Sequence, residues 1–321
     1  MIPRVQVDLA QAPALRWRGL APHRQAARAM ADSYLKDLGG MANFAPLLGA
    51  YRAGFVRSEY GEEMDAVAEL IGRPAEQVLL ANLYYDAFRA LVGCTAFAID
   101  TESGPIHGRN LDWWTEKNML AKHTQIAEFR GGSAPGPYAS VGWPAFIGVF
   151  SAVAQGRFAI SLNAVLSDET PTLAESIALL LRRVFDTVPS FDAAVELLST
   201  APIAADCLLL VTGTKAGEMV VVERTSTRAA VRTAENGFIV VTNDYRSLDG
   251  GFASLSEGAL HATACSRFDR ASYLVLDRKV ASFGAGFDIL TDAKVKMDIT
   301  VQHMLMQAAT GALEVRLPSR R

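Results

Sequence analysis

The chain has 321 residues, half of them hydrophobic, so it is long enough to bury a substantial core as one large folded unit or two modest ones. Its 31 basic and 34 acidic residues are spread along the sequence, with a formal net charge of -3. This distribution argues against a nucleic-acid partner, because such proteins gather basic residues on one face. The three cysteines are odd in number and widely spaced, which fits neither a disulfide framework nor a zinc site and favours a reducing compartment.

The first residues lack the basic and apolar stretches of a secretory signal, so we expect a cytoplasmic protein. The sequence contains no run of about 18 apolar residues that would predict a transmembrane helix, although contact with a membrane surface stays open. Residues 22–38 and 59–91 are rich in Ala, Leu, Glu and Met at helical spacing, with an interruption at Gly72-Arg73-Pro74. The first 93 residues are therefore predicted to be mainly helical.

The pattern changes at Cys94, where a strand-like run begins. A turn signal at residues 101–104 separates this run from a second one at 105–112. The two runs predict a β-hairpin whose first strand begins at the cysteine.

Two apolar runs, 145–151 and 157–163, predict further strands. Thr172 and Glu175 form a capping box ahead of one central helix, and Ser190 is placed to cap a second. The rest of the chain predicts an antiparallel meander at 207–212, 219–223, 229–232 and 238–243, then a helix at 266–278 and strands near 297–305 and 312–317. Strands, two central helices and more strands predict a layered α+β fold rather than a parallel Rossmann alternation.

The sequence lacks the motifs of several common metal, nucleotide and hydrolase sites. The sequence contains no His-Glu-x-x-His, Cys-x-x-Cys, Gly-x-Ser-x-Gly, P-loop or Gly-x-Gly-x-x-Gly pattern, so we expect neither a metal nor a cofactor. Cys207 lies in a Leu-rich strand and is interpreted as a buried apolar residue. Cys94 differs because it follows Gly93 at the change from helix to strand.

Cys94-Thr95, followed by Gly108-Arg109-Asn110-Leu111-Asp112, resembles the N-terminal-nucleophile (Ntn) hydrolase superfamily of linear amide C–N hydrolases. This superfamily includes the acid ceramidase, N-acylethanolamine acid amidase, choloylglycine hydrolase and penicillin V acylase families. Two stretches, 7–17 and 81–86, are similar to the ceramidase and acylethanolamine-amidase branch. Thr242-Asn243-Asp244-Tyr245 resembles that branch with its last two residues exchanged, and Ser266–Ala271 resembles the choloylglycine branch.

The resemblance implies an αββα sandwich of antiparallel sheets with an N-terminal helical region. It also implies self-cleavage between Gly93 and Cys94, which would divide the chain into a helical segment, 1–93, and a catalytic core, 94–321. The two parts are expected to stay associated as one integrated unit.

The same resemblance assigns roles to individual residues. Cys94 is the expected nucleophile, with its freed α-amine as the general base, and Arg109 is expected to favour the thiolate. Asp112 would orient the α-ammonium group. Because strict strand alternation puts residues 109 and 112 on opposite faces, these roles require the strand to end or bulge near Asn110.

Asn163 and Asn243 are candidates for an oxyanion hole, and Arg267 is a candidate for orienting groups near the nucleophile. The ceramidase branch carries a Glu where this chain has Ala164, directly after Asn163. We therefore do not expect ceramide or acylethanolamine specificity to be copied unchanged.

The predicted function is hydrolysis of an N-acyl amide, with a medium or long acyl chain on a small polar amine. Penicillin V, bile-salt or acyl-homoserine-lactone acylase activity and acyl transfer to an amine are the alternatives, and a non-enzymatic scaffold is disfavoured because Cys94, Arg109 and Asp112 are all present. The apolar stretch 44–56 is predicted either to border a lipid entrance or to pack onto the core. Trp113 and Trp114 either line an acyl pocket or belong to the core, and His107 is expected to be structural.

Overall fold

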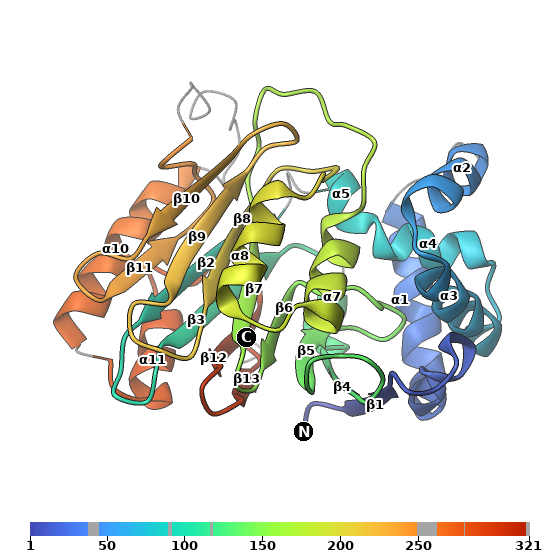
Figure 1. Cartoon of the computed structure of the whole chain (residues 1–321), viewed down its shortest axis with the longest axis horizontal. Coiled ribbons are helices and arrows are strands. Elements are labelled where there is room, and N and C mark those ends of the chain that lie inside the picture. The colour runs from blue at the N-terminus through green and yellow to red at the C-terminus, as the bar shows by residue number, and fades with distance from the viewer. Residues whose placement is uncertain (38–44, 89–91, 116–117, 249–261, 279, 319–321) are drawn as a thin grey trace.

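The computed structural model describes the chain except for residues 38–44, 89–91, 116–117, 249–261, 279 and 319–321. Two β-sheets lie face to face in it, and helices cover the outer face of each (Figure 1). The predicted α+β sandwich, with the N-terminal helices at one end, is confirmed.

The larger sheet has eight strands, in the order β1 (Arg4–Asp8), β4 (Gln125–Arg130), β5 (Tyr138–Gly142), β6 (Ser151–Ala154), β7 (Phe158–Ala164), β8 (Cys207–Thr212), β9 (Met219–Arg224) and β10 (Ala229–Thr233). The smaller sheet has five, in the order β11 (Phe238–Val241), β2 (Val92–Ile99), β3 (Ile106–Trp113), β12 (Thr300–Gln307) and β13 (Ala312–Arg316). Neighbouring strands pair antiparallel except for β1, which pairs parallel with β4 at the edge of the larger sheet. The N-terminal strand was not predicted.

Helices α10 (Ala264–Arg278) and α11 (Phe283–Leu290) pack on the smaller sheet, where Phe97 and Val240 contact Leu274 and Phe287 within one core cluster. Helices α7 (Ile177–Thr187) and α8 (Phe191–Thr200) cover the larger sheet (Figure 1). The other α-helices among the described residues are α1 (Arg24–Asp37), α2 (Ala45–Phe55), α3 (Ser58–Ile71), α4 (Ala75–Asn82), α5 (Tyr84–Phe88) and α6 (Met119–Lys122), and two short 3-10 helices, η1 (Pro13–Leu15) and η2 (Arg18–His23), precede α1. As predicted, α3 ends at Gly72, whose left-handed backbone (φ 64°) turns the chain into α4.

The run 145–151 is not a strand, and β6 begins only at Ser151. The backbone of the run 145–151 forms other hydrogen bonds. Asn82 Oδ1 accepts from the amides of Ile147 (2.8 Å) and Gly148 (3.2 Å). A buried apolar run can therefore satisfy its backbone without a neighbouring strand.

The capping box is also wrong, because Thr172 donates to the carbonyl of Ile203 and Glu175 pairs with Arg183. Ser190 does cap α8, accepting from the amide of Ala193.

The last strand of the predicted meander crosses to the other sheet. β8, β9 and β10 follow one another in the larger sheet, but β11 pairs with β2 in the smaller one. The crossing occurs at Asn236-Gly237, where both residues have left-handed backbone conformations. This crossing brings the residues after β11, including Asn243, beside Cys94.

A buried charge cluster ties the N-terminal helices to α7. The fully buried Glu63 of α3 accepts hydrogen bonds from Arg182 of α7, at 3.1 and 3.2 Å, and from the indole of Trp17 at 2.6 Å. On its other side Arg182 donates to Asp186 at 2.9 Å, and Asp186 also accepts from Tyr138. Every charge in the cluster has a partner, as burial requires.

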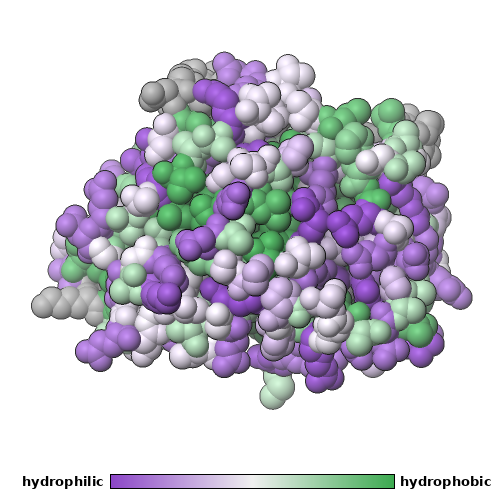
Figure 2. All heavy atoms as spheres, viewed as in Figure 1, coloured by the Kyte–Doolittle hydropathy of each residue, from purple (hydrophilic) through white to green (hydrophobic). Residues whose placement is uncertain are grey.

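Two large apolar side chains are exposed near α2. Leu47 is 68% exposed, and Leu173 in the loop before α7 is 77% exposed. Tyr51 of α2 joins the two segments by donating to the carbonyl of Ala174. Figure 2 shows apolar atoms at the surface in this region, toward the upper right. Phe44 lies outside the described residues, and lipid contact by this segment stays a prediction. None of the helices in the described part of the chain has the length and apolarity to cross a membrane.

Candidate active site

Cys94 lies in β2 with its side chain between the two sheets. The β2–β3 register pairs Cys94 with Leu111 and Ala96 with Arg109, so these four residues share one face. The Arg109 Nη2 atom is 3.4 Å from the Cys94 sulfur, and the sulfur is 3.6 Å from the carbonyl oxygen of Leu162 in β7. Burial raises the pKa of the Cys94 thiol, and the Arg109 guanidinium opposes that effect.

The guanidinium of Arg109 is itself held in place from the larger sheet. Its Nη1 donates to the hydroxyl of Ser151 in β6 at 2.6 Å, and its Nη2 donates to the carbonyl of Leu162 at 2.5 Å. Arg109 and Ser151 are both almost fully buried. Ser151 therefore helps to aim the cation at the sulfur, a role that its sequence context does not reveal.

Asp112 lies on the opposite face of β3, toward α10 and α11. The β2–β3 pairing keeps one register from Val92 to Ile99, so the strand end or bulge expected near Asn110 is not there. The irregularity lies in β12, where the register with β3 shifts between Thr300 and Gln302. Asp112 pairs directly with Gly93 and is therefore next to the Gly93–Cys94 peptide bond.

The two carboxylate oxygens of Asp112 differ. Oδ1 accepts a hydrogen bond from the hydroxyl of Thr300 at 2.5 Å, whereas Oδ2 is buried and has no hydrogen-bond partner among the described residues. Burial raises the pKa of Asp112, and the charge of Arg267, the Thr300 hydrogen bond and the charge of Arg109 oppose the rise. An unpartnered buried oxygen of this kind is suited to accept a new donor.

Arg267 reaches Cys94 from α10. Its Nη1 donates to the Cys94 carbonyl at 2.6 Å and to the Thr95 hydroxyl at 2.8 Å, and its Nη2 donates to Asn243 Oδ1 at 2.8 Å. The guanidinium therefore connects the nucleophile's main chain to the loop after β11.

The two asparagines bind main-chain groups in this arrangement. Asn243 Oδ1 accepts from the Cys94 amide at 3.0 Å, and its Nδ2 donates to the carbonyl of Ala164 at 2.7 Å. Asn163 Nδ2 donates to the carbonyls of Val241 and Thr242, while its buried Oδ1 lacks a partner within the part of the chain that the structure covers. The side-chain nitrogen of each asparagine thus donates to a main-chain carbonyl, and the oxyanion-hole role of these residues stays a prediction.

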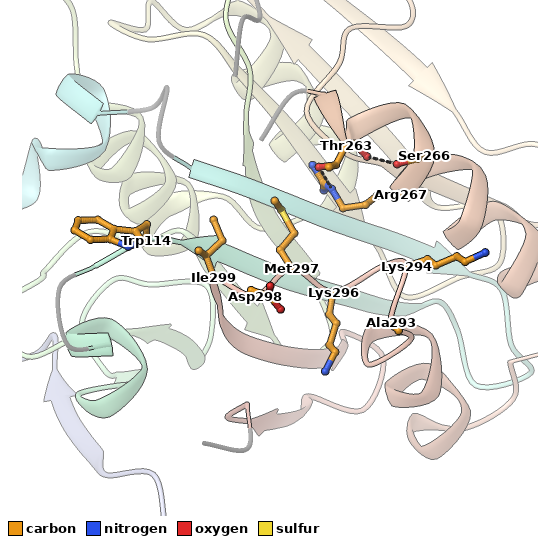
Figure 3. A pocket seen from close by; sticks show the side chains of 10 residues that line it. All are labelled: Trp114, Thr263, Ser266, Arg267, Ala293, Lys294, Lys296, Met297, Asp298 and Ile299. Carbon is orange, nitrogen blue, oxygen red and sulfur yellow. Dashed lines mark hydrogen bonds between the residues drawn. The ribbon is translucent and has the colours of Figure 1, made fainter. Parts of the chain in front are cut away.

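A pocket of about 690 Å³ opens beside this group, between the start of α10 and residues 293–299 (Figure 3). Arg267 lies on one wall, and Trp114, Met297 and Ile299 lie across from it. The complete lining is Trp114, Thr263, Ser266, Arg267, Ala293, Lys294, Lys296, Met297, Asp298 and Ile299. The two neighbouring tryptophans have different environments. Trp113 is buried in the core, whereas Trp114 is 61% exposed and lines the pocket.

His107 connects the two sheets away from the nucleophile. Its ring nitrogens contact the hydroxyls of Ser161 at 2.7 Å and Thr212 at 3.2 Å, and burial lowers its pKa to about 3. These buried contacts agree with the structural interpretation of His107. In the described ranges, no three His, Cys, Asp or Glu side chains gather as metal ligands do.

Comparison with known proteins supports the resemblance seen in the sequence. A family model described as "Acyl-coenzyme A:6-aminopenicillanic acid acyl-transferase" matches residues 99–278, a range that contains Arg109, Asp112, Asn163, Asn243 and Arg267. Acid ceramidase of Mus musculus is 23% identical over 293 residues, covering 82% of this chain and 71% of the relative. N-acylethanolamine-hydrolyzing acid amidase of Caenorhabditis elegans is 26% identical over 194 residues, covering 55% of this chain and 54% of the relative.

A solved structure has a similar fold. The Caenorhabditis elegans ortholog of N-acylethanolamine-hydrolyzing acid amidase superposes with a TM-score of 0.54 at 22% identity, covering 67% of this chain and 93% of that one. The family match together with this similar fold confirms the resemblance to Ntn hydrolases of the linear-amide class.

Proposed function

We propose that Cys94 is the nucleophile of this chain and that N-acyl amides are its substrates, because the chain belongs to the acyl-coenzyme A:6-aminopenicillanic acid acyl-transferase family. Its relatives are named as an acid ceramidase and an acid amidase, and the chain is a hydrolase of carbon–nitrogen bonds in linear amides. In our proposal Cys94 becomes active when the chain cleaves itself after Gly93.

The observation that carries this proposal is the convergence of three side chains on one cysteine. Asn243 binds the Cys94 amide, Arg267 binds its carbonyl, and Arg109 lies 3.4 Å from its sulfur. A cysteine that only fills core volume requires none of these polar contacts. Three buried polar groups are more readily explained by chemistry at Cys94.

The proposed self-cleavage takes two steps. The Cys94 sulfur attacks the Gly93 carbonyl carbon, the Gly93–Cys94 C–N bond breaks, and the Cys94 nitrogen takes up a proton. Water then hydrolyses the Gly93 thioester, which leaves a carboxylate on Gly93 and a free thiol and α-amine on Cys94. The new α-ammonium forms beside Asp112, whose Oδ2 is available to accept its hydrogen bond.

The mature residue then has its own base. An α-amine has a reference pKa of about 7.7–8.0, so a useful neutral fraction exists near neutral pH. The amine takes the thiol proton, the thiolate attacks the substrate carbonyl, and the resulting α-ammonium protonates the departing amine. Water releases the acyl group from Cys94. Asn163 and Asn243 stay our candidates for stabilising the oxyanion.

The pocket supports an apolar acyl group. Trp114, Met297 and Ile299 form an apolar wall, and Arg267 joins that pocket to the main chain of Cys94. We propose a medium or long acyl chain on a small polar amine as the substrate. Ala164, in place of the ceramidase-branch Glu, argues against simple transfer of ceramide or acylethanolamine specificity.

Acyl transfer is the second candidate, because the matching family is described as an acyl-transferase. Transfer and hydrolysis share the acyl-thioester and differ only in whether an amine or water attacks it. Adding an amine acceptor and measuring the ratio of new amide to free acid separates the two.

Self-cleavage is tested by the intact mass of the denatured protein. We expect wild-type enzyme to separate into two fragments that meet between Gly93 and Cys94, with activity rising in step with cleavage. A fully active sample that consists of a single 34.5 kDa species contradicts the α-amine mechanism.

Replacing Trp114 with alanine tests the acyl pocket. We expect kcat/KM for a long-chain N-acyl amide to fall about fivefold relative to a short-chain one, because loss of an apolar contact costs about 1 kcal/mol. Trp114→Phe should retain most of the preference. Tyr273→Ala removes an exposed aromatic side chain outside the pocket and is the matched control. An unchanged chain-length preference in Trp114→Ala argues against this assignment of the pocket.

A further inference from the structure

Thr300 occupies an irregular position at the start of β12. The pairing of β12 with β3 joins Thr300 to Asp112 and Gln302 to Leu111, so Val301 is an extra residue on the β12 side. A β-bulge of this kind redirects a side chain and is common near active sites. Here it allows Thr300 to lie directly opposite Asp112.

The hydroxyl of Thr300 has both of its roles fixed. It accepts a hydrogen bond from the amide of Met297 at 2.9 Å and donates to Asp112 Oδ1 at 2.5 Å. Because the Met297 amide can only donate, the hydroxyl hydrogen is directed to the carboxylate. Asp112 Oδ1 must therefore accept, and Oδ2 is the oxygen available for another donor.

We propose that Thr300 is a positioning residue for the reaction, which keeps Asp112 ionised and leaves Oδ2 for the α-ammonium of Cys94. This inference rests on the proposed function, since the α-ammonium exists only after cleavage. It adds a residue that the sequence resemblance did not assign.

The same turn connects Asp112 to the substrate pocket. Met297 and Ile299 line the pocket, the Thr300 amide donates to the Met297 carbonyl at 3.0 Å, and the Trp113 amide donates to the Ile299 carbonyl at 3.0 Å. Residues 297–300 thus hold one wall of the pocket and one oxygen of Asp112 in a single hydrogen-bonded turn.

The pKa of Asp112 depends on all the charged and polar groups near its carboxylate. Arg267 approaches from α10, Arg109 from β3, the Cys94 thiol from β2 and the Thr300 hydroxyl from β12. Burial raises the pKa of Asp112, and the Thr300 hydrogen bond opposes this rise. Removing the hydroxyl raises the pKa further, so the ionised form is lost at a higher pH as the pH falls.

The test compares Thr300→Val, which keeps the shape, with Thr300→Ser, which keeps the hydroxyl. In the cleaved enzyme we expect the pKa of Asp112, followed by carbon-13 NMR of labelled aspartate, to rise by about one unit in Thr300→Val, consistent with loss of a hydrogen bond to a charged group. Thr300→Ser should retain the wild-type pKa. Thr124→Val is the matched control, because the buried Thr124 hydroxyl contacts Gln302 of β12 without contacting Asp112.

A second measurement does not depend on cleavage. In the uncleaved Cys94→Ala chain, carbon-13 NMR of labelled aspartate follows the titration of Asp112, and Thr300→Val should raise its pKa there too. Thr300→Ala replaces Thr300→Val if the valine variant does not fold. An unmoved pKa overturns the inference about Thr300. If Thr300→Val raises the pKa of Asp112 but the wild-type chain never cleaves, the hydrogen bond from Thr300 has the expected effect and only the α-amine mechanism is refuted.

Discussion

Cys94→Ala is expected to leave the 34.5 kDa chain whole and to lower amidase activity by about 10⁴-fold or more, because it removes the nucleophile of both reactions. The first readout is the intact mass after prolonged incubation, and the second is hydrolysis of an N-acyl amide. Cys94→Ser should retain the contacts with Arg109 while cleaving and hydrolysing slowly, because a hydroxyl is the weaker nucleophile.

The other cysteines provide the matched controls. Cys265 is exposed and 3.6 Å from Asp244, and Cys207 is buried in β8. Cys265→Ala should cleave and hydrolyse as wild type does. If Cys94→Ala cleaves normally, or if Cys265→Ala alone loses activity, the nucleophile has been assigned to the wrong residue.

Glu63→Ala is expected to lower the free energy of unfolding by about 3–5 kcal/mol, since Arg182 loses one of its two carboxylate partners and the buried Trp17 indole loses its acceptor. Arg16 and Arg182 balance Glu63 and Asp186 in the intact cluster. Urea unfolding in the Cys94→Ala background measures the change on an uncleaved chain, so fragment dissociation does not enter. Glu63→Gln should cost less because it keeps an acceptor for the Trp17 indole.

Glu314→Ala provides the surface comparison, because Glu314 pairs with Arg316 and both side chains are about half exposed. Exposed pairs of this type contribute little to stability. If Glu63→Ala costs no more than Glu314→Ala, the buried cluster does not stabilise the fold. In the cleaved enzyme, the same cluster links residues 1–93 to the rest, so Glu63→Ala should also release the N-terminal fragment at lower urea.

Local patterns predicted the elements whose backbone partners are close in sequence. The hairpin around Cys94 and the cap at Ser190 depend on a few neighbouring residues, and both are present, although β2 begins at Val92 rather than at the cysteine. The run 145–151 was misassigned because apolarity alone does not show whether the backbone bonds a strand or the side chain of Asn82. The sheet to which β11 belongs could not be predicted, because alternation of apolar and polar residues indicates a strand but not the strand with which it pairs.

The candidate site divides in the same way. Cys94, Arg109 and Asp112 could be proposed because they occupy two adjacent strands in a recognisable motif. Ser151 and Thr300 could not, since they are single hydroxyl residues 42 and 188 positions from the groups they bind. The strand end or bulge expected near Asn110, which would have brought Arg109 and Asp112 to one face, was the main error. The two residues lie on opposite sides of one strand, with Arg109 next to the thiol and Asp112 beside the Gly93–Cys94 peptide bond.

Asn243 and Arg267 bind the main-chain nitrogen and oxygen of Cys94. Changing the cysteine side chain therefore removes the reacting atom and leaves the surrounding framework in place. The Cys94→Ala chain should accordingly bind intact ligands in its pocket as a trap, which makes it suitable for crystallographic capture of substrates from mixtures.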